Sequence, residues 1–176
     1  MFRMQASLAA AALVLVGAAR RSAGAATATS PGRTVASPVA STDACSLLSA
    51  ADVSKAIEAK SLPGEPLGDS NVNSCIWSDD PNHSLDSRRV TLSMNSSVAR
   101  FESVKSRGGH IAIVPLSGVG DDAYYEIVDP VAILQVRKAS VVMTIRVLNG
   151  SKLAPFTVEQ EKAKEAELGR AAVGRL

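Results

Sequence analysis

Apolar and polar residues alternate along the middle of the chain and predict β-strands. In 89–95 every second residue is apolar, and 141–147 repeats this period. A period of two places the apolar side chains on one face of a strand, so each segment is expected to bury one face. The segment 131–137 is apolar nearly throughout and predicts a more central strand. Two shorter β-prone segments, 75–77 and 124–128, bring the predicted number of strands to five.

The first predicted helix begins at a capping box formed by Ser49 and Asp52, a spacing that lets both side chains bond to free amides. Apolar residues then recur at helical spacing, and Pro63 with Gly64 ends the pattern. A second helix is predicted over 98–105 because its apolar residues are spaced in the same way.

The C-terminal segment predicts a third helix. It opens with a second capping box, formed by Thr157 and Gln160, and carries acidic residues early and basic residues late, as the helix dipole favours. In chain order the segments are helix, two strands, helix, three strands and helix. This order is typical of an α+β domain, with an antiparallel sheet of about five strands and helices packed on one face.

Two turns are predicted between these elements. Lys138 and Ala139 separate two strands and indicate a hairpin, although the usual Gly or Asn is missing. The segment 118–121, Gly-Val-Gly-Asp, lacks the third glycine of a dinucleotide fingerprint and the lysine of a P-loop. It therefore predicts a tight turn with positive φ at its glycines.

Residues 1–25 have the form of an export signal. A short basic start precedes an apolar run from Ala6 to Ala19, and Ala23 with Ala25 supplies a cleavage motif. The run is shorter than the roughly 20 residues of a membrane-spanning helix, and the alternative is an uncleaved N-terminal anchor. No cysteine directly follows the run, so lipid anchoring is not expected.

Residues 26–44 are rich in Ala, Ser, Thr and Pro and show no apolar period. Burial could not offset the entropy of ordering such a segment, so it predicts a disordered linker. The remaining residues, 45–176, are enough for one domain of ordinary size.

The charge balance argues against nucleic acid and anionic membranes as partners. The chain has 19 basic and 17 acidic residues, a net charge of +2. The signal segment holds Arg3, Arg20 and Arg21 but no acidic residue, so its removal leaves a net charge of −1. A chain without a basic surplus has no electrostatic footprint for polyanions.

The chain has two cysteines, Cys45 and Cys75, and an even number in an exported chain predicts a disulfide. Closing a loop of this length stabilises the fold by roughly 3–4 kcal/mol in the chain-entropy model. The alternatives are a two-ligand metal site or two free thiols. Neither His83 nor His110 has metal-ligand spacing with a cysteine, so no metal is predicted.

The order of several motifs resembles an actinobacterial family of secreted proteins and lipoproteins, the domain of unknown function 3558. The landmarks are 45–48 (Cys-Ser-Leu-Leu), 51–53 (Ala-Asp-Val), 75–77 (Cys-Ile-Trp), 118–123 (Gly-Val-Gly-Asp-Asp-Ala), 136–138 (Val-Arg-Lys) and a charged C-terminal helix. The resemblance covers residues 45–176 and implies an exported envelope domain. The family name assigns no activity, so the resemblance names no catalytic or ligand-binding residue.

The acidic pairs 79–80 and 121–122, together with Glu126, are the candidate metal ligands or acid–base groups. Adjacent residues of a strand point to opposite faces, so neither pair forms a ready-made dyad. For the pair 79–80, which Pro81 and Asn82 follow, a solvated turn is the favoured interpretation. His83 and His110 are the candidate general bases, but both lie in loop-like sequence and no G-x-S-x-G motif accompanies them.

Three aromatic residues are the candidate binding surface: Trp77, Tyr124 and Tyr125. Trp77 lies two residues after Cys75, on the same side of the strand, so packing beside the disulfide is its favoured role. The two tyrosines are adjacent and face opposite sides, so one is expected in the core and the other at the surface.

These observations predict an exported, non-catalytic α+β binding or interaction module of the cell envelope, with no cofactor and no catalytic residue. Its partner is an envelope protein or a small ligand, and no membrane span is expected after signal cleavage. Two alternatives stay open. One is an envelope hydrolase whose triad is invisible in sequence, and the other is a regulator or inhibitor that docks on an envelope protein.

Overall fold

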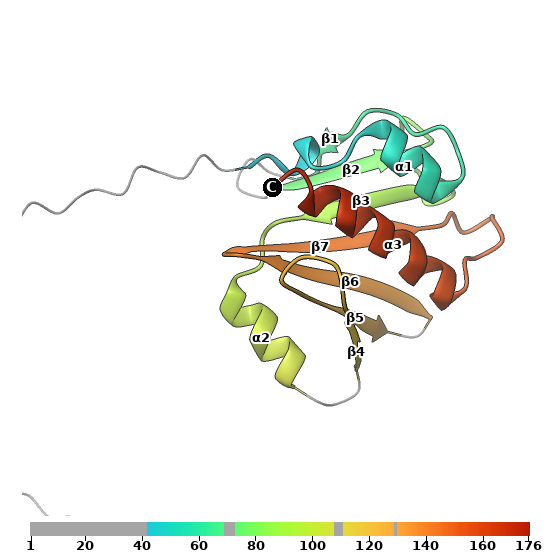
Figure 1. The fold of residues 1–176 in the computed structure, drawn as a ribbon. Coiled ribbons are helices and arrows are strands. Elements are labelled where there is room, and N and C mark those ends of the chain that lie inside the picture. Colours follow the sequence, from blue (N-terminus) through green and yellow to red (C-terminus); the bar gives the residue numbers. More distant parts are fainter. Residues whose placement is uncertain (1–41, 69–72, 108–110, 129) are drawn as a thin grey trace, which may run out of the picture. The chain divides into compact units, whose positions relative to one another are not determined.

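A seven-stranded antiparallel sheet and three α-helices make up the folded part of the chain (Figure 1). The structure is a computed structural model that describes residues 42–68, 73–107, 111–128 and 130–176. The predicted signal segment, 1–25, and nearly all of the predicted linker, 26–44, lie outside these residues.

The sheet confirms the α+β class, with seven strands in place of the predicted five. The strands β1 to β7 span Glu65–Pro66, Ser74–Ser78, Arg89–Ser93, Ala112–Leu116, Asp122–Val128, Val131–Lys138 and Val141–Leu148. They lie in the order β1-β2-β3-β7-β6-β5-β4, and every neighbouring pair is antiparallel. The helices α1, α2 and α3 span Ala50–Ile57, Val98–Ser106 and Val158–Val173, and a short 3-10 helix, η1, spans Ala44–Ser46.

The two strands that the sequence pattern missed lie at the two edges of the sheet. β1 has only two residues, too few to show a period. β4 contains Pro115, which has no backbone N–H and therefore argues against a strand. An edge strand accommodates proline because one side of its backbone needs no partner.

Local sequence fixes the helix ends. In α1 the Ser49 hydroxyl accepts from the Asp52 amide while Asp52 accepts from the Ser49 amide, and α3 begins with the equivalent pair of bonds. The helix α1 ends at Ile57, earlier than the predicted stop at Pro63. Glu58 adopts a left-handed conformation, with φ of 56°, and closes the helix there.

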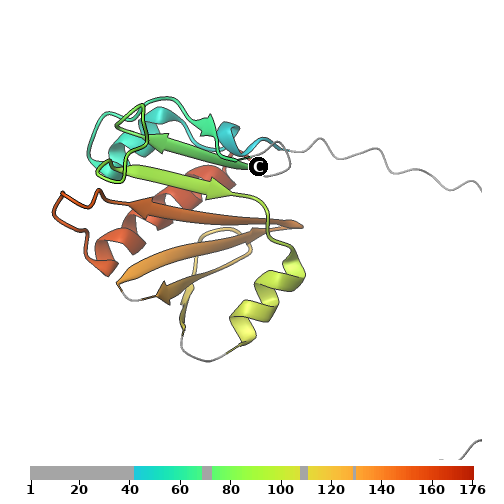
Figure 2. The ribbon, with the colours of Figure 1, turned by 180° about the vertical axis from the view of Figure 1, so that it is seen from behind.

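The helices are divided between the two faces of the sheet, which corrects the prediction that they share one face. α1 and α3 cover the face formed by the alternating apolar residues of β3, β5, β6 and β7, and these residues form the main core. In Figure 1 α3 crosses in front of the strands, and in Figure 2 it lies behind them. On the opposite face α2 packs Phe101 against Tyr124 and Val142.

Both predicted turns are present. β6 and β7 form a hairpin in which Lys138 lies opposite Val141, and Ala139 between them has a φ of 52°. Gly118 and Gly120 have φ values of 78° and 64°, as the turn at 118–121 requires. A side chain at Gly120 would also meet a backbone carbonyl, because an added Cβ would lie 2.5 Å from the Arg137 oxygen.

The folded part begins before the predicted boundary at Cys45. Ala44 is fully buried in the core, and its amide donates to Asn73 Oδ1 at 2.8 Å. Asp43 caps η1 by accepting from the Cys45 amide. The last residues of the predicted linker are therefore part of the domain.

Candidate functional site

The predicted disulfide is present and lies in a tightly packed region, which we call the disulfide corner: Cys45, Gly64, Cys75 and Trp77. The Cα atoms of Cys45 and Cys75 are 5.1 Å apart, and the bond joins η1 to β2. Trp77 is only 1% exposed. A Cβ added to Gly64 would lie 2.5 Å from Trp77 Nε1 and 2.8 Å from Cys75 Sγ, so the chain passes directly over the indole. Trp77 therefore fills the core and offers no binding surface.

Both tyrosines are buried, so the expectation that one of them lies at the surface is wrong. Tyr125 faces the α3 side, where its hydroxyl donates to the Lys162 carbonyl at 2.5 Å. Tyr124 faces the other side and is covered by α2, whose Phe101 carbonyl accepts from the Tyr124 hydroxyl at 3.1 Å. The sequence argument failed because β5 is covered on both faces. Burial raises the pKa of each phenol to about 12.

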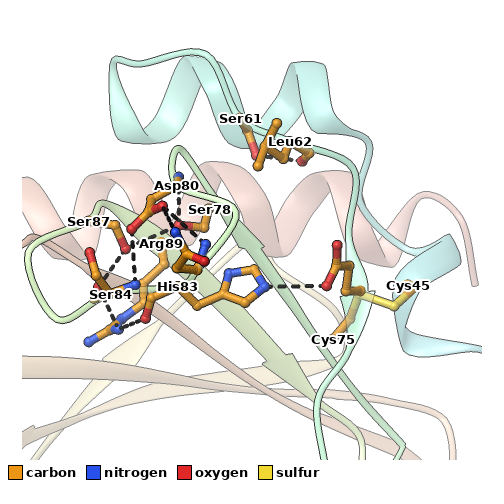
Figure 3. Close-up of polar contacts among 12 residues, drawn as sticks. Cys45, Ser61, Leu62, Cys75, Ser78, Asp80, His83, Ser84, Ser87 and Arg89 are labelled. Carbon is orange, nitrogen blue, oxygen red and sulfur yellow. Dashed lines mark hydrogen bonds and ion pairs between the residues drawn. A yellow bond between two sulfur atoms is a disulfide. The ribbon is translucent and has the colours of Figure 1, made fainter.

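His83, the hydrolase candidate inside the described residues, lies in the loop between β2 and β3 (Figure 3). Its Nε2 lies 3.4 Å from Glu65 Oε2, while its Nδ1 is buried and has no hydrogen-bond partner among the described residues. The nearby serines bond elsewhere in that loop: Ser78 donates to Ser87, and Ser87 donates to the Ser84 carbonyl. Among the described residues, His83 therefore forms no nucleophile–base hydrogen bond. The other candidate, His110, lies outside the described residues.

The acidic pair 79–80 lies in the loop after β2, as the predicted turn requires, whereas Asp122 and Glu126 belong to β5. Asp80 accepts from the amides of Asn82 and Ser84. Hydrogen bonding to the Ser84 side chain, followed by the Asn82 amide, holds the pKa of Asp80 below its ordinary value. Asp121 accepts from Lys138 Nζ and the Ala139 amide, and its pKa is likewise lowered. Across the part of the chain that the structure describes, no three metal-ligating side chains come together.

The sheet itself carries an irregularity that the sequence did not reveal, which we call the β6–β7 split. The two strands pair from Lys138–Val141 to Leu134–Ile145. Beyond that point 131–133 pairs only with β5, and 146–148 pairs only with β3. Backbone amides inside the split therefore need partners from outside the sheet.

Two glutamates of α3 supply those partners. Glu161 Oε2 accepts from the Ala132 amide at 3.0 Å, and Glu165 Oε1 accepts from the Val147 amide at 3.0 Å. Glu161 and Glu165 are one helical turn apart and therefore project from the same face of α3. They are 8% and 0% exposed, so both carboxyl groups lie between the helix and the sheet.

Burial raises the pKa of both carboxyl groups. Desolvation raises the pKa of Glu165 to about 9, and the neighbouring Glu161 adds to this effect, while the Val147 amide and Arg146 oppose it. Desolvation also raises the pKa of Glu161, against the Ala132 hydrogen bond and Arg146. Glu165 Oε2 is buried without a hydrogen-bond partner among the described residues. Burial therefore favours the uncharged form of the Glu165 carboxyl group.

A cavity of about 630 Å³ opens at the mouth of the split, and we call it the split cavity. Its wall is formed by the start of β6, the end of β7, the 149–157 loop and the first turn of α3. Most of its lining side chains are apolar, among them Val131, Leu148, Leu153, Phe156 and Val158, and Glu161 is the one ionisable group among the described residues of the lining. This is the composition of a small-molecule site.

A smaller groove of about 300 Å³ lies on the opposite face, beside α2. Its polar residues bond to one another across the strands: Thr144 donates to Gln135 Oε1, and Gln135 donates to Glu126 Oε1, each at 2.8 Å. Arg146 also lines this groove. Arg146 Nε is buried there without a hydrogen-bond partner among the described residues. The groove has about half the volume of the split cavity, and we therefore take the split cavity as the candidate site.

The chain matches no family model, no curated protein and no solved structure. The resemblance to the domain of unknown function 3558 therefore stays a prediction. None of the described helices has the length and apolar character that crossing a bilayer requires. The disulfide is typical of proteins that fold in an oxidising compartment.

Sequence reasoning missed both glutamates of the candidate site. The acidic residues early in the C-terminal helix were interpreted only as partners for the helix dipole, and neither glutamate was singled out. The signal was present in the apolar stripe of α3, where Leu168 and Ala172 face the core. Extending that stripe by steps of three and four residues toward the N-terminus reaches Glu165 and then Glu161.

Proposed function

We propose that the protein is an exported, non-catalytic binding module of the cell envelope, and that its ligand site is the split cavity. The observation that carries the proposal is the cavity itself, an apolar-lined space of about 630 Å³ whose described wall residues include one carboxyl group, that of Glu161. Ligand sites in proteins have volumes of about 300–1,000 Å³ and combine an apolar lining with a few polar groups.

Export is supported by the signal-like segment 1–25 and by the disulfide between Cys45 and Cys75. The order of motifs over 45–176 supports placing the chain beside the domain of unknown function 3558. Both observations support a location in the cell envelope. The ligand that we propose for this location is a small molecule.

The hydrolase alternative has less support. Among the described residues His83 has a carboxylate neighbour but makes no hydrogen bond to a serine hydroxyl, and the split cavity lacks a histidine in its lining. A regulator that docks through a sheet edge is also disfavoured. One edge strand has two residues, and the other contains Pro115, two features that limit pairing with another chain.

The test is binding of small apolar fragments, followed by amide chemical shifts. We expect shifts at Val131, Leu148 and Leu153, and we expect Leu153→Trp to abolish them because the larger side chain fills the cavity. The control is Leu67→Trp, which enlarges a side chain that is 40% exposed and does not line the cavity.

Two outcomes would contradict the proposal. One is fragment binding that Leu153→Trp leaves unchanged. The other is turnover of ester, peptide or glycoside substrates that His83→Ala or His110→Ala abolishes, which would establish the hydrolase.

A further inference from the structure

The chemistry of the split cavity defines the class of ligand that it recognises, and this inference rests on the proposed function. Three polar side chains of the lining already bond within the protein. Asn149 accepts from Arg88 Nε and donates to the Ala154 carbonyl, Ser151 donates to Asp86 Oδ1, and Thr157 accepts from the Gln160 amide. These groups stabilise the walls of the cavity.

Glu161 differs from them. Its Oε2 accepts from the Ala132 amide, whereas its Oε1 has no hydrogen bond to any residue that the structure describes. The side chain lines the cavity, so this free oxygen is the acceptor that the protein offers to a ligand. A carboxylate oxygen is a strong acceptor, so a ligand that brings a charged donor forms a charge-assisted hydrogen bond there.

The positive charges around the cavity do not neutralise Glu161 by ion pairing. Lys164 lies over the Phe156 ring, 4.6 Å from its centre, but pairs with Glu58 Oε1 at 2.6 Å. Arg146 lines the groove on the opposite face and forms no ion pair within the described part of the chain. Glu161 is therefore available to a cation that enters from the cavity side.

We infer that the split cavity binds a small organic amine, whose ammonium group donates to Glu161 Oε1 while its apolar body packs against Val131, Leu148 and Phe156. The volume of the cavity suits a small molecule, and its apolar walls exclude a ligand that is polar throughout. A carboxylic acid of the same length would place like charges side by side and should bind poorly.

Three probes of equal length test the inference: hexylamine, hexanol and hexanoate, each titrated into the full exported domain. We expect hexylamine to bind at least about tenfold more tightly than hexanol, because a charge-assisted hydrogen bond is stronger than a neutral one, and hexanoate to bind most weakly. Intermolecular contacts should place the amine end beside Glu161 and the methyl end beside the apolar walls.

Glu161→Gln is the decisive variant, because its amide oxygen can still accept from Ala132. It should lower hexylamine affinity about tenfold, to the level of hexanol, and leave hexanol affinity unchanged. Glu159→Gln is the matched control: it changes the same residue type on the same helix, at an exposed position outside the lining, and should keep the amine preference. If Glu161→Gln does not fold, the order of the three probes and their orientation in the wild-type protein still decide the question.

The possible failures are distinguishable. Equal binding of the three probes, or an amine preference that survives Glu161→Gln, would overturn the inference and leave the proposed binding site in place. Binding of none of the probes, together with no fragment binding at the cavity, would contradict the proposed function as well.

Discussion

Two regions of the interface between helices and sheet are filled in opposite ways. In the disulfide corner the contacts are apolar and cross-linked, with Trp77 and Cys75 buried beneath Gly64. In the β6–β7 split the same interface holds two carboxyl groups, Glu161 and Glu165, where apolar side chains would be expected. Burying carboxyl groups opposes folding unless they are hydrogen-bonded, and Glu165 has one oxygen without a partner.

The comparison separates stability from function. In the disulfide corner, the buried indole of Trp77 and the disulfide both stabilise the fold. The split is less favourable than a continuous sheet over an apolar helix face would be, and it opens into the cavity that we propose as the ligand site. Departures of this kind, where local rules are broken without a structural gain, are expected at functional sites.

The largest effect is expected at the corner. Trp77→Ala removes a fully buried indole and should lower the free energy of unfolding by roughly 3–5 kcal/mol, because the cavity that it leaves cannot close around the disulfide. Chemical denaturation followed by circular dichroism measures the change. A loss below about 1 kcal/mol would mean that the corner is loosely packed.

Removal of the disulfide comes next. Replacing Cys45 and Cys75 with Ala should lower stability by roughly 3–4 kcal/mol, because the unfolded chain is no longer constrained. Secondary structure should survive, since β3 and β5–β7 lie outside the closed loop. Mass spectrometry before and after reduction first establishes the bond in the exported protein, and two alkylatable thiols before reduction would contradict it.

In the β6–β7 split, replacing a buried side chain should raise the free energy of unfolding, whereas the changes in the disulfide corner lower it. Folding raises the pKa of Glu165 from 4.5 to about 9, so the folded chain keeps a proton that the unfolded chain loses across this range. Stability from this group is therefore greatest below about pH 4.5 and falls as the pH rises toward 9. Glu165→Gln cannot ionise, so it should raise the free energy of unfolding at pH 8 by roughly 1–3 kcal/mol and flatten its pH dependence.

Glu159→Gln is the control for that experiment, because Glu159 is exposed on the same helix. Its substitution should leave both stability and pH dependence nearly unchanged. If the two variants behave alike, the buried carboxyl group has no special role in the split.

The smallest effect is expected at the start of the folded part. Deleting 1–41 should change the melting temperature by about a degree at most, because 26–41 shows no apolar period. Deleting three further residues should be clearly destabilising, since the Thr42 carbonyl accepts from Asn73 Nδ2 and Ala44 is buried. Comparing the melting temperatures of the two truncated proteins locates the residue at which the folded part begins.

The sequence predicted the regular parts of this fold because they follow simple periods. The five predicted strands, the three helices and the two capping boxes are all present, and of the helix ends only that of α1 differs clearly, at Ile57 in place of Pro63. It did not predict that α2 covers the second face, because Phe101 and Val104 have the same spacing whichever face they cover. The prediction that one of the two tyrosines is exposed was wrong for the same reason, because α2 covers Tyr124.

The candidate site was less accessible to sequence reasoning. The disulfide followed from two cysteines in a chain expected to be exported. The β6–β7 split depends on where two strands stop pairing, and nothing in 131–133 or 146–148 marks that point. A glutamate on an amphipathic helix is usually solvated, so only the register of the stripe through Leu168 could have indicated that Glu165 is buried.

The most direct test of the contrast between corner and split is the titration of the glutamate side chains by carbon-detected NMR. We predict that the Glu165 carboxyl carbon titrates near pH 9 and that the Glu161 carboxyl carbon titrates above 4.5. Adding hexylamine should then shift the Glu161 signal and its titration while leaving Glu159 unchanged. Ordinary titration of both carboxyl groups near 4.5 would contradict the account, because it would mean that the split is open to water and holds no buried acid.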